Sequence, residues 1–320
     1  MGKEIVLAAD LGGTNLRVAA VDHQGTILYR TRRETPRGES VDEIVQAIVE
    51  SANECRENCA DFDQFKVLCV GIPATVNVDK GIIITAPNLP ELNNFKMVVA
   101  LENELGIKAI LENDANAAAV GENWRGASKG FVDSILVTLG TGVGGGIIIG
   151  GKILRGAGGM AGEIGHICVE SFGVPCPCGS RGCVEQYSSA SAIVRIAKEL
   201  AAQYPDSILN NNAQLKASEV FHAGINGDHL ALDVFRQMGF YLGVALTSLI
   251  NILNPEVIVI GGGASAGWKL FVPHLRETIR QKAFGGVSER VKLVRGQLGD
   301  DAGILGTAKI ALSKLQTLRH

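Results

Sequence analysis

The segment EIVLAADLGGTNLRVAAVD, residues 4–22, decides the fold class of this chain. Residues 4–9 are an apolar run that predicts a buried strand, and residues 16–22 alternate enough to predict a second strand. The Gly-Gly pair in the LGGTN segment between them, residues 11–15, is typical of a tight turn. The chain therefore opens with a predicted hairpin, and the polar residues of its turn are Asp10, Thr14 and Asn15.

A second segment, SILVTLGTGVGGGIIIGGKIL at 134–154, has the same arrangement of strand, glycine-rich turn and strand. We read SILVTL as a strand, GTGVGGG as a turn and IIIGGKIL as another strand. Residues 5–28 and 135–154 are therefore interpreted as divergent copies of one structural device.

The length of 320 residues suits two packed domains better than one core. We expect an α/β fold with a small α/β domain over 1–118 and a large α/β domain over 119–302. The C-terminal helix, residues 303–320, is expected to pack back on the small domain. The other predicted elements are helices at 40–60, 95–105 and from 115 onward, and strands at 67–72, 82–84, 107–112 and 257–263.

The glycine-rich turns are candidate phosphate loops, because glycine lets backbone N–H groups approach a phosphate. A Walker A motif is absent, and the β-rich run after GTGVGG argues against a Rossmann dinucleotide site. Asp10 stands at a strand end, where it could hold a hydrated Mg²⁺. For each turn, a hairpin without a ligand is the alternative. The candidate nucleotide-binding residues are Asp10, Gly12, Gly13, Thr14, Asn15, Thr141, Gly142, Gly144, Gly261, Gly262 and Gly263.

Asn113 and Asp114 follow a predicted strand and precede a strong helix-forming run, so they are expected at a helix N-terminus. A simple helix cap is one interpretation. A sugar-binding role is the other, because amides and carboxylates present paired groups to vicinal hydroxyls. The candidate substrate-binding residues are Asn88, Asn113, Asp114, Glu163, His166 and Glu185.

Three cysteines within eight residues, together with a histidine upstream, form a candidate metal site. Three thiolates and one imidazole suit tetrahedral Zn²⁺, and four protein ligands are typical of a structural ion. Free thiols in a flexible loop are the alternative. Cys168 could compete as a ligand, but its apolar neighbours predict that it faces the core. The candidate metal ligands are His166, Cys176, Cys178 and Cys183.

The composition argues against several classes of protein. Apolar residues make up 46% and charged residues 20%, and the net charge of −3 comes from mixed signs, which indicates no attraction to nucleic acid or membrane. No apolar run reaches the roughly 20 residues of a membrane span, and the first apolar run is too short for a signal peptide. We therefore expect a cytoplasmic protein, in which seven cysteines are not expected to form disulfides.

Five motifs, taken together, resemble the ROK family of sugar kinases and repressors. They occur in the family's order and, with the GGG run, extend over nearly the whole chain, so the joint match is specific. The five motifs are DLGGTN at 10–15, NDANAA at 113–118, LGTGVGGG at 139–146, EIGH at 163–166 and CPCGSRGCVE at 176–185, and the GGG run is at 261–263.

The resemblance implies the two-domain actin-like ATPase fold, which is ribonuclease H-like, with a cleft that closes on sugar and ATP. Asp114 matches the family's catalytic aspartate, and His166 matches both a sugar ligand and a zinc ligand. The other matched sugar ligands are Asn88, Asn113, Glu163 and Glu185, and the other matched zinc ligands are Cys176, Cys178 and Cys183. The family also suggests a homo-oligomer, either a dimer or a tetramer.

Within the family, GAGGMAGEIGH at 156–166 and the PNLP loop are most similar to ATP-dependent glucokinases. We therefore expect transfer of the ATP γ-phosphoryl group to the 6-hydroxyl of a hexose, with glucose the first choice. Kinases of N-acetylmannosamine, N-acetylglucosamine, fructose or allose are alternatives, as is a sugar-sensing regulator without catalysis. A repressor would need a helix-turn-helix extension, for which the ten residues up to Asp10 leave no room. We also expect Gly142→Val to raise the KM for ATP and leave sugar binding largely intact.

Overall fold

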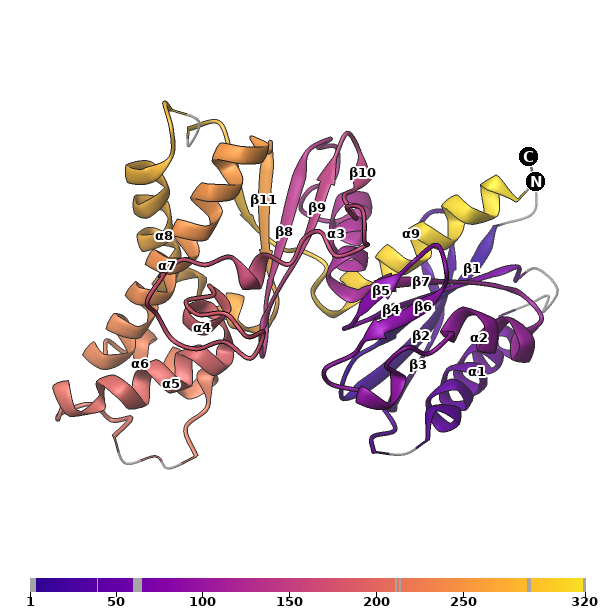
Figure 1. Cartoon of the computed structure of the whole chain (residues 1–320), viewed down its shortest axis with the longest axis horizontal. Coiled ribbons are helices and arrows are strands. Elements are labelled where there is room, and N and C mark those ends of the chain that lie inside the picture. The colour runs from indigo at the N-terminus through magenta and orange to yellow at the C-terminus, as the bar shows by residue number, and fades with distance from the viewer. Residues whose placement is uncertain are drawn as a thin grey trace. The chain divides into compact units, whose positions relative to one another are not determined.

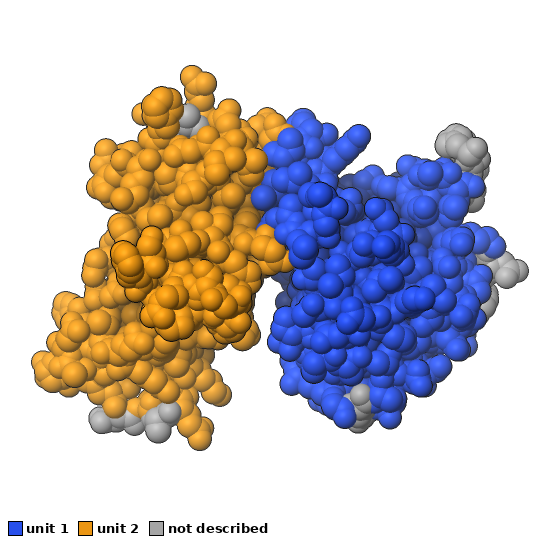
Figure 2. Space-filling view, in the orientation of Figure 1, with its two compact units in different colours: residues 1–132, 146–162, 297–320 blue, residues 133–145, 163–296 orange. Residues whose placement is uncertain are grey.

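The computed structural model describes residues 4–38, 40–59, 65–210, 212, 214–286 and 289–318. The chain divides into two compact units, shown in blue and orange in Figure 2. Unit 1 comprises Met1–Val132, Gly146–Gly162 and Gln297–His320, and unit 2 comprises Asp133–Gly145 and Glu163–Gly296. Each unit contains helices and a β-sheet, so the chain has the mixed α/β architecture that its sequence predicts.

The sheet of unit 1 has the strand order β3-β2-β1-β4-β7 (Figure 1). The first hairpin is confirmed, because β1 pairs antiparallel with β2, which in turn pairs antiparallel with β3. Strands β4 and β7 continue the sheet in the parallel direction. The strands are β1 Ile5–Leu11, β2 Asn15–Asp22, β3 Ile27–Glu34, β4 Val67–Ile72 and β7 Lys108–Asn113, and a separate pair is β5 Thr75–Asn77 with β6 Ile82–Thr85.

Both faces of this sheet are buried, because alternate side chains of β1 enter different cores. Leu7 and Ala9 belong to the core that includes residues of α1 and α2, whereas Val6 and Ala8 belong to the core that includes residues of α9. Helix α9 contacts β1, β4 and α3. The helices of unit 1 are α1 Val41–Glu57, α2 Met97–Leu105, α3 Asp114–Arg125 and α9 Ala302–Thr317, with short 3-10 turns η2 Pro90–Leu92 and η7 Gly299–Asp301.

The second sheet has the order β10-β9-β8-β11-β12, which matches the order of the first sheet strand for strand. In both sheets a three-stranded opening is followed by two further strands that run parallel to the first, as β11 does to β8 and β12 does to β11. This shared topology supports the interpretation of two divergent copies. The strands are β8 Ser134–Leu139, β9 Val143–Ile149, β10 Lys152–Ile153, β11 Val257–Gly261 and β12 Lys292–Arg295.

The helices of unit 2 include the long pair α7 and α8, which contact each other along their length. The helices are α4 Glu185–Ser188, α5 Ala190–Leu200, α6 Ala217–Ile225, α7 His229–Leu253 and α8 Trp268–Lys282, and the 3-10 turns are η3 Ile164–His166, η4 Ala201–Gln203 and η5 Gly263–Gly267. Across the part of the chain that the structure describes, no helix combines the length and apolar character needed to cross a membrane.

Three local expectations differ from the structure. The run at 140–146 is not all turn, because β9 already begins at Val143 and its glycines form part of the strand. The predicted strand at 147–154 is divided, because Gly150 and Gly151 have positive φ and form a turn between β9 and the antiparallel β10. Strand β3 was not predicted, because its sequence ILYRTRRE carries four charged residues and resembles a surface segment. One of its arginines, Arg32, nevertheless contacts Asn15 of the first turn.

Candidate functional site

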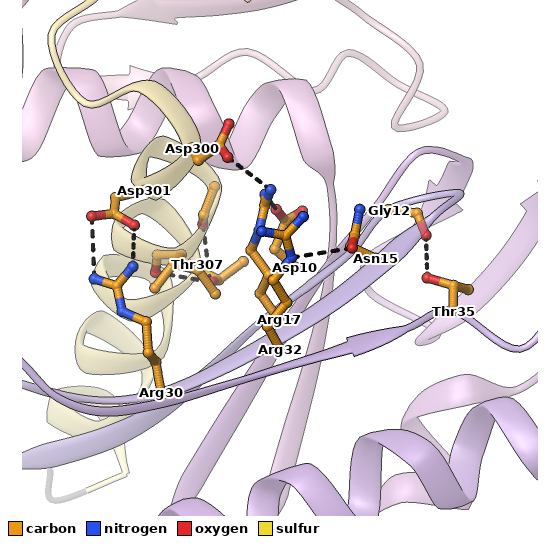
Figure 3. A network of polar contacts seen from close by, with 12 residues as sticks. Asp10, Gly12, Asn15, Arg17, Arg30, Arg32, Thr35, Asp300, Asp301 and Thr307 are labelled. Atoms are coloured by element: carbon orange, nitrogen blue, oxygen red, sulfur yellow. Dashed lines mark hydrogen bonds and ion pairs between the residues drawn. The ribbon is translucent and has the colours of Figure 1, made fainter.

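The turn between β1 and β2, which contains LGGTN, is held by its own backbone and by side chains from the segment after β3. The Gly12 N–H donates to the Asn15 carbonyl over 2.9 Å, and the Thr35 hydroxyl donates to the Gly12 carbonyl over 2.7 Å (Figure 3). Arg37 donates from Nη2 to Thr14 Oγ1 over 2.6 Å and from Nε to the Gly13 carbonyl. A guanidinium therefore lies directly against the turn proposed to bind phosphates.

Asp10, at the end of β1, lies within a network of ion pairs (Figure 3). Arg17 bridges two carboxylates, Asp10 over 3.3 Å and Asp300 over 2.9 Å. Burial raises the pKa of Asp10 above its ordinary value, and the charge and hydrogen bond of Arg17 oppose that rise. Asp300 belongs to the 3-10 turn before α9, so Arg17 ties this turn to the end of β1.

Asn113 and Asp114 lie at the junction of β7 and α3. Asn113 is the N-cap: its Oδ1 accepts the Asn116 N–H over 3.0 Å, and its Nδ2 donates to the Ala74 carbonyl over 3.2 Å. Asp114 is the first helical residue, and its Oδ1 accepts the Ala115 N–H over 2.8 Å. The predicted helix start is thus confirmed, with the cap assigned to Asn113.

Asp10 and Asn113 lie at the same edge of the unit 1 sheet. Strands β1, β4 and β7 are parallel, with Asp10 opposite Gly71 and Asn113 opposite Ile72. Asn88 is also close to the first turn, because a Cβ added to Gly13 would lie 3.5 Å from the Asn88 Cβ. The carboxyl ends of parallel strands are where open α/β sheets usually bind ligands. Unit 1 therefore brings together candidates for phosphate binding and for sugar binding.

The turn between β8 and β9 has a different neighbour. The Gly140 N–H donates to the Gly142 carbonyl over 2.9 Å, and the Val143 N–H donates to Glu185 Oε2 over 2.9 Å. A Cβ added to Gly142 would lie only 2.3 Å from the same Glu185 oxygen. A side chain at Gly142 would therefore displace the Glu185 carboxylate, so the expectation that Gly142→Val leaves sugar binding largely intact holds only if Glu185 does not bind the sugar.

The EIGH segment meets the same turn. A Cβ added to Gly165 would lie 2.1 Å from the Val143 carbonyl oxygen, so the backbones of the two segments are in direct contact. Glu163 precedes the 3-10 turn Ile164–His166, and both Glu163 and His166 are exposed. Val143 thus lies between two segments that carry candidate sugar ligands, residues 163–166 and α4.

Two further contacts complete the surroundings of this turn. The Thr141 carbonyl accepts the Ser191 hydroxyl over 2.9 Å. Gly262 has φ = 81°, and a Cβ there would lie 2.5 Å from the Leu139 carbonyl oxygen, so the 261–263 run packs against the end of β8. The structure thereby brings together two of the three glycine runs, both in unit 2.

The four candidate metal ligands converge. One ligand atom from each of His166, Cys176, Cys178 and Cys183 lies within 4.8 Å of the others. His166 directs Nδ1 toward Cys176 Sγ, 3.8 Å away, and Cys178 Sγ lies 3.7 Å from Cys183 Sγ. The expectation for Cys168 was wrong: it is exposed rather than directed into the core. The backbone of Cys168 forms an isolated antiparallel bridge with the buried Cys183, while its own side chain faces outward.

Comparison with known proteins identifies the family of this chain. The sequence profile of the ROK family matches residues 6–314. This chain belongs to the ROK family. It is 34% identical over 319 residues to a glucokinase from Thermotoga maritima, covering 98% of this chain and 99% of that protein. It is 36% identical over 307 residues to a glucokinase from Halalkalibacterium halodurans, covering 94% and 92%.

A solved structure extends the similarity to three dimensions. The ROK family glucokinase from Streptomyces griseus, determined in complex with glucose and AMPPNP, superimposes with a TM-score of 0.81 at 34% identity. The match covers 97% of this chain and 99% of that one. The similarity to a ROK kinase structure is therefore continuous across both units.

Sequence reasoning did not find several charged residues of this ROK-family chain that contact the candidate site. Arg17 and Arg37 contact residues of the first turn, and Arg32 donates to Asn15 Oδ1 over 3.1 Å. The buried Glu112 carboxylate forms an ion pair with Arg155 beside Asn113. A charged residue at the end of the apolar strand 108–113 was the one signal that pointed to Glu112.

Proposed function

We propose that this chain is an ATP-dependent glucose kinase that transfers the γ-phosphoryl group of ATP to the 6-hydroxyl of glucose. The observation that carries the proposal is its full-length similarity to the Streptomyces griseus glucokinase, whose structure contains glucose and AMPPNP. The contact of Glu185 with the turn at Gly142 and Val143 supports it, because it places a candidate sugar ligand against a candidate phosphate loop.

The fold that we propose is the two-domain actin-like, ribonuclease H-like ATPase fold. The matching strand orders of the two sheets support it, since such a fold arises from two copies of one unit. We further propose that the functional domains are residues 1–118 with 303–320, and residues 119–302. The packing of α9 on β1 and β4 supports the assignment of the C-terminal helix to the first domain.

Asp114 is proposed as the catalytic base. It accepts the proton of the 6-hydroxyl as the bond from that oxygen to the γ-phosphorus forms and the bond to the β,γ-bridging oxygen breaks, which leaves ADP. The N-terminus of α3 favours the negative charge of this carboxylate. The transition state of phosphoryl transfer is loose, so positioning and charge neutralisation contribute most of the catalysis.

Glucose is proposed to bind through paired amide and carboxylate groups, which suit vicinal hydroxyls. Asn113 is well placed to present a fixed side chain, because both of its side-chain ends are already held by the backbone. The proposed sugar-binding residues are Asn88, Asn113, Asp114, Glu163, His166 and Glu185.

The nucleotide phosphates are proposed to bind at the glycine-rich turns, with the 261–263 run beside the nucleoside. The carboxylate of Asp10 suits a Mg²⁺ ion, which takes one or two protein carboxylates and keeps several waters. When bound, this ion neutralises charge on the phosphates. The proposed nucleotide-binding residues are Asp10, Gly12, Gly13, Thr14, Asn15, Thr141, Gly142, Gly144, Gly261, Gly262 and Gly263.

Zinc is proposed for the cysteine cluster, and the donor set fits it: three sulfurs and one imidazole nitrogen within 4.8 Å of one another. Four protein ligands leave no open position, so the ion is structural and holds the segment that leads into α4. Nδ1 of His166 faces the cluster, which leaves Nε2 to donate to the sugar. The need for reduced thiols agrees with a cytoplasmic location, and a homo-oligomer is proposed from the family.

A coupled assay of ADP release over a panel of hexoses tests the function. We expect glucose to give the highest kcat/KM, because a site that hydrogen-bonds the 2-hydroxyl rejects sugars in which it is blocked. Asp114→Asn, measured alongside, should lower kcat by at least about 100-fold while glucose affinity changes much less. Faster turnover of N-acetylmannosamine, or near-normal turnover by Asp114→Asn, would contradict the substrate or the base, respectively.

A further inference from the structure

A buried carboxylate, Glu112, is paired with the half-buried Arg155 next to Asn113 and the proposed base Asp114. The Glu112 side chain is 1% exposed and that of Arg155 is 35% exposed. Arg155 donates to Glu112 Oε2 from both Nε and Nη2, over 3.0 and 2.5 Å. A buried carboxylate is costly unless it is paired and hydrogen-bonded, and here the guanidinium fork satisfies one of its oxygens.

The other oxygen of the same carboxylate binds the first turn of α3. Glu112 Oε1 accepts the Asn113 N–H over 3.0 Å and the Asn116 Nδ2 over 3.1 Å. Asn113 in turn caps the helix by accepting the Asn116 N–H. Glu112, Asn113 and Asn116 therefore form one closed set of hydrogen bonds around the residue that precedes Asp114.

Arg155 comes from a segment that packs on this helix turn. A Cβ added to Gly146 in β9 would lie 2.5 Å from the Ala119 Cβ and 2.8 Å from the Ala115 carbonyl oxygen. Arg155 follows β10, the strand that pairs with the end of β9. Strand β9 thus packs against the start of α3, and the segment after β10 places the Arg155 guanidinium next to Glu112.

We propose that Glu112 and Arg155 are positioning residues that act as a unit to fix Asn113 and Asp114 for phosphoryl transfer. A protein is often at least as stable when a buried ion pair is replaced by an apolar pair of similar size. Stability alone therefore does not explain why Glu112 is paired with Arg155 here. The contacts of Glu112 do explain how Asn113 is oriented: one carboxylate oxygen accepts from Asn113 and Asn116, and the other accepts from Arg155. The inference rests on the proposed kinase function, in which Asp114 is the base.

The experiment compares Arg155→Met, Arg155→Lys, Glu112→Gln and the double variant Glu112→Gln/Arg155→Met by steady-state kinetics with glucose and ATP. Arg280→Met is the matched control, since Arg280 forms a forked pair with Glu277 on α8, which carries none of the proposed site residues. Melting temperature is measured for every variant, and kcat is expressed per ATP-binding site. Loss of folded protein is thereby separated from loss of turnover.

We expect Arg155→Met to lower kcat about 10- to 100-fold, as displacement of a supported catalytic group does, with the KM for ATP nearly unchanged. Arg155→Lys should recover only part of the loss, because lysine has no fork. The double variant leaves no unpaired buried charge, and it should be no slower than Arg155→Met, because the two residues act together. Arg280→Met should turn over like the wild type.

Wild-type kcat in Arg155→Met, or a loss explained by its folded fraction, would overturn the proposal. So would full recovery by Arg155→Lys or losses that multiply in the double variant. Failure of the proposed function has a different signature: the unmodified protein would release no ADP with any hexose of the panel, or Asp114→Asn would turn over normally.

Discussion

The two glycine-rich turns are built alike and surrounded by opposite charges. The first, between β1 and β2, has arginines bound to its residues: Arg37 to Thr14 and Arg32 to Asn15. The second, between β8 and β9, has a carboxylate instead, since Glu185 accepts the Val143 N–H. Both turns are closed by a backbone hydrogen bond that a glycine N–H donates, over 2.9 Å in each case.

Two turns of similar sequence can therefore have neighbouring side chains of opposite charge, because those side chains come from other parts of the chain. The arginines at the first turn come from β3 and the segment after it, and they add positive charge where phosphates are proposed. The carboxylate at the second turn comes from α4, and it occupies the space that a Cβ of Gly142 would need. The first turn therefore has guanidinium groups beside its candidate phosphate ligands, whereas the second has the carboxylate of a candidate sugar ligand beside it.

The largest expected effect on kinetics comes from adding one methyl group to the second turn, and the same change in the first turn is the comparison. Gly142→Ala should lower kcat/KM by more than about 100-fold and raise the KM for both glucose and ATP, because the new Cβ must displace Glu185. Gly13→Ala is the matching change in the first turn; its Cβ would meet Asn88 at an ordinary 3.5 Å and displace no carboxylate, so we expect a smaller rise, in the KM for ATP alone. Steady-state kinetics with either substrate varied measure both. Similar kinetics for the two variants would break the comparison.

Removal of the proposed metal should weaken glucose binding near the second turn and leave ATP binding at the first turn largely unchanged. Cys178→Ala, or a strong chelator, should weaken glucose binding about 10- to 100-fold, because the cluster orders His166 and the segment before Glu185. ATP binding should change much less, and the melting temperature should fall. Calorimetric titration and metal analysis provide the measurements, with about one zinc per chain expected. A metal-free protein with normal glucose affinity would contradict this prediction.

The smallest expected effect concerns the cationic neighbours of the first turn. Arg37→Ala should raise the KM for ATP about 3- to 10-fold, as the loss of an exposed charged contact to phosphate does, and leave the KM for glucose unchanged. Arg33→Ala is the control, because Arg33 pairs with Glu50 and Glu54 rather than with the turn. An equal rise in both variants, or a rise in the KM for glucose, would argue against a specific role of Arg37.

Much of the fold was predictable because its signals are local. The apolar runs at 5–9 and 67–72 are long enough to be strands in any environment. The helix after Asn113 has a cap residue followed by strong helix formers, so its start could be located to one residue. Strand β3 lacked such a signal, since only pairing with β2 makes a strand of its charged sequence.

Local sequence was enough to predict the two hairpins, the glycines of their turns, the helix start at Asn113 and Asp114, and the spacing of four candidate metal ligands. Each depends on neighbours a few residues away, whose backbone preferences and side-chain chemistry act over short distances.

Which charged side chains contact these elements depends on the tertiary structure. Arg17 bridges to Asp300, 283 positions away along the chain, and Arg155 reaches Glu112 across 43 positions. Glu185 meets Val143 across 42. Ion pairs and close backbone approaches depend on distance in space, which packing of the sheets and helices sets and which sequence separation does not reveal.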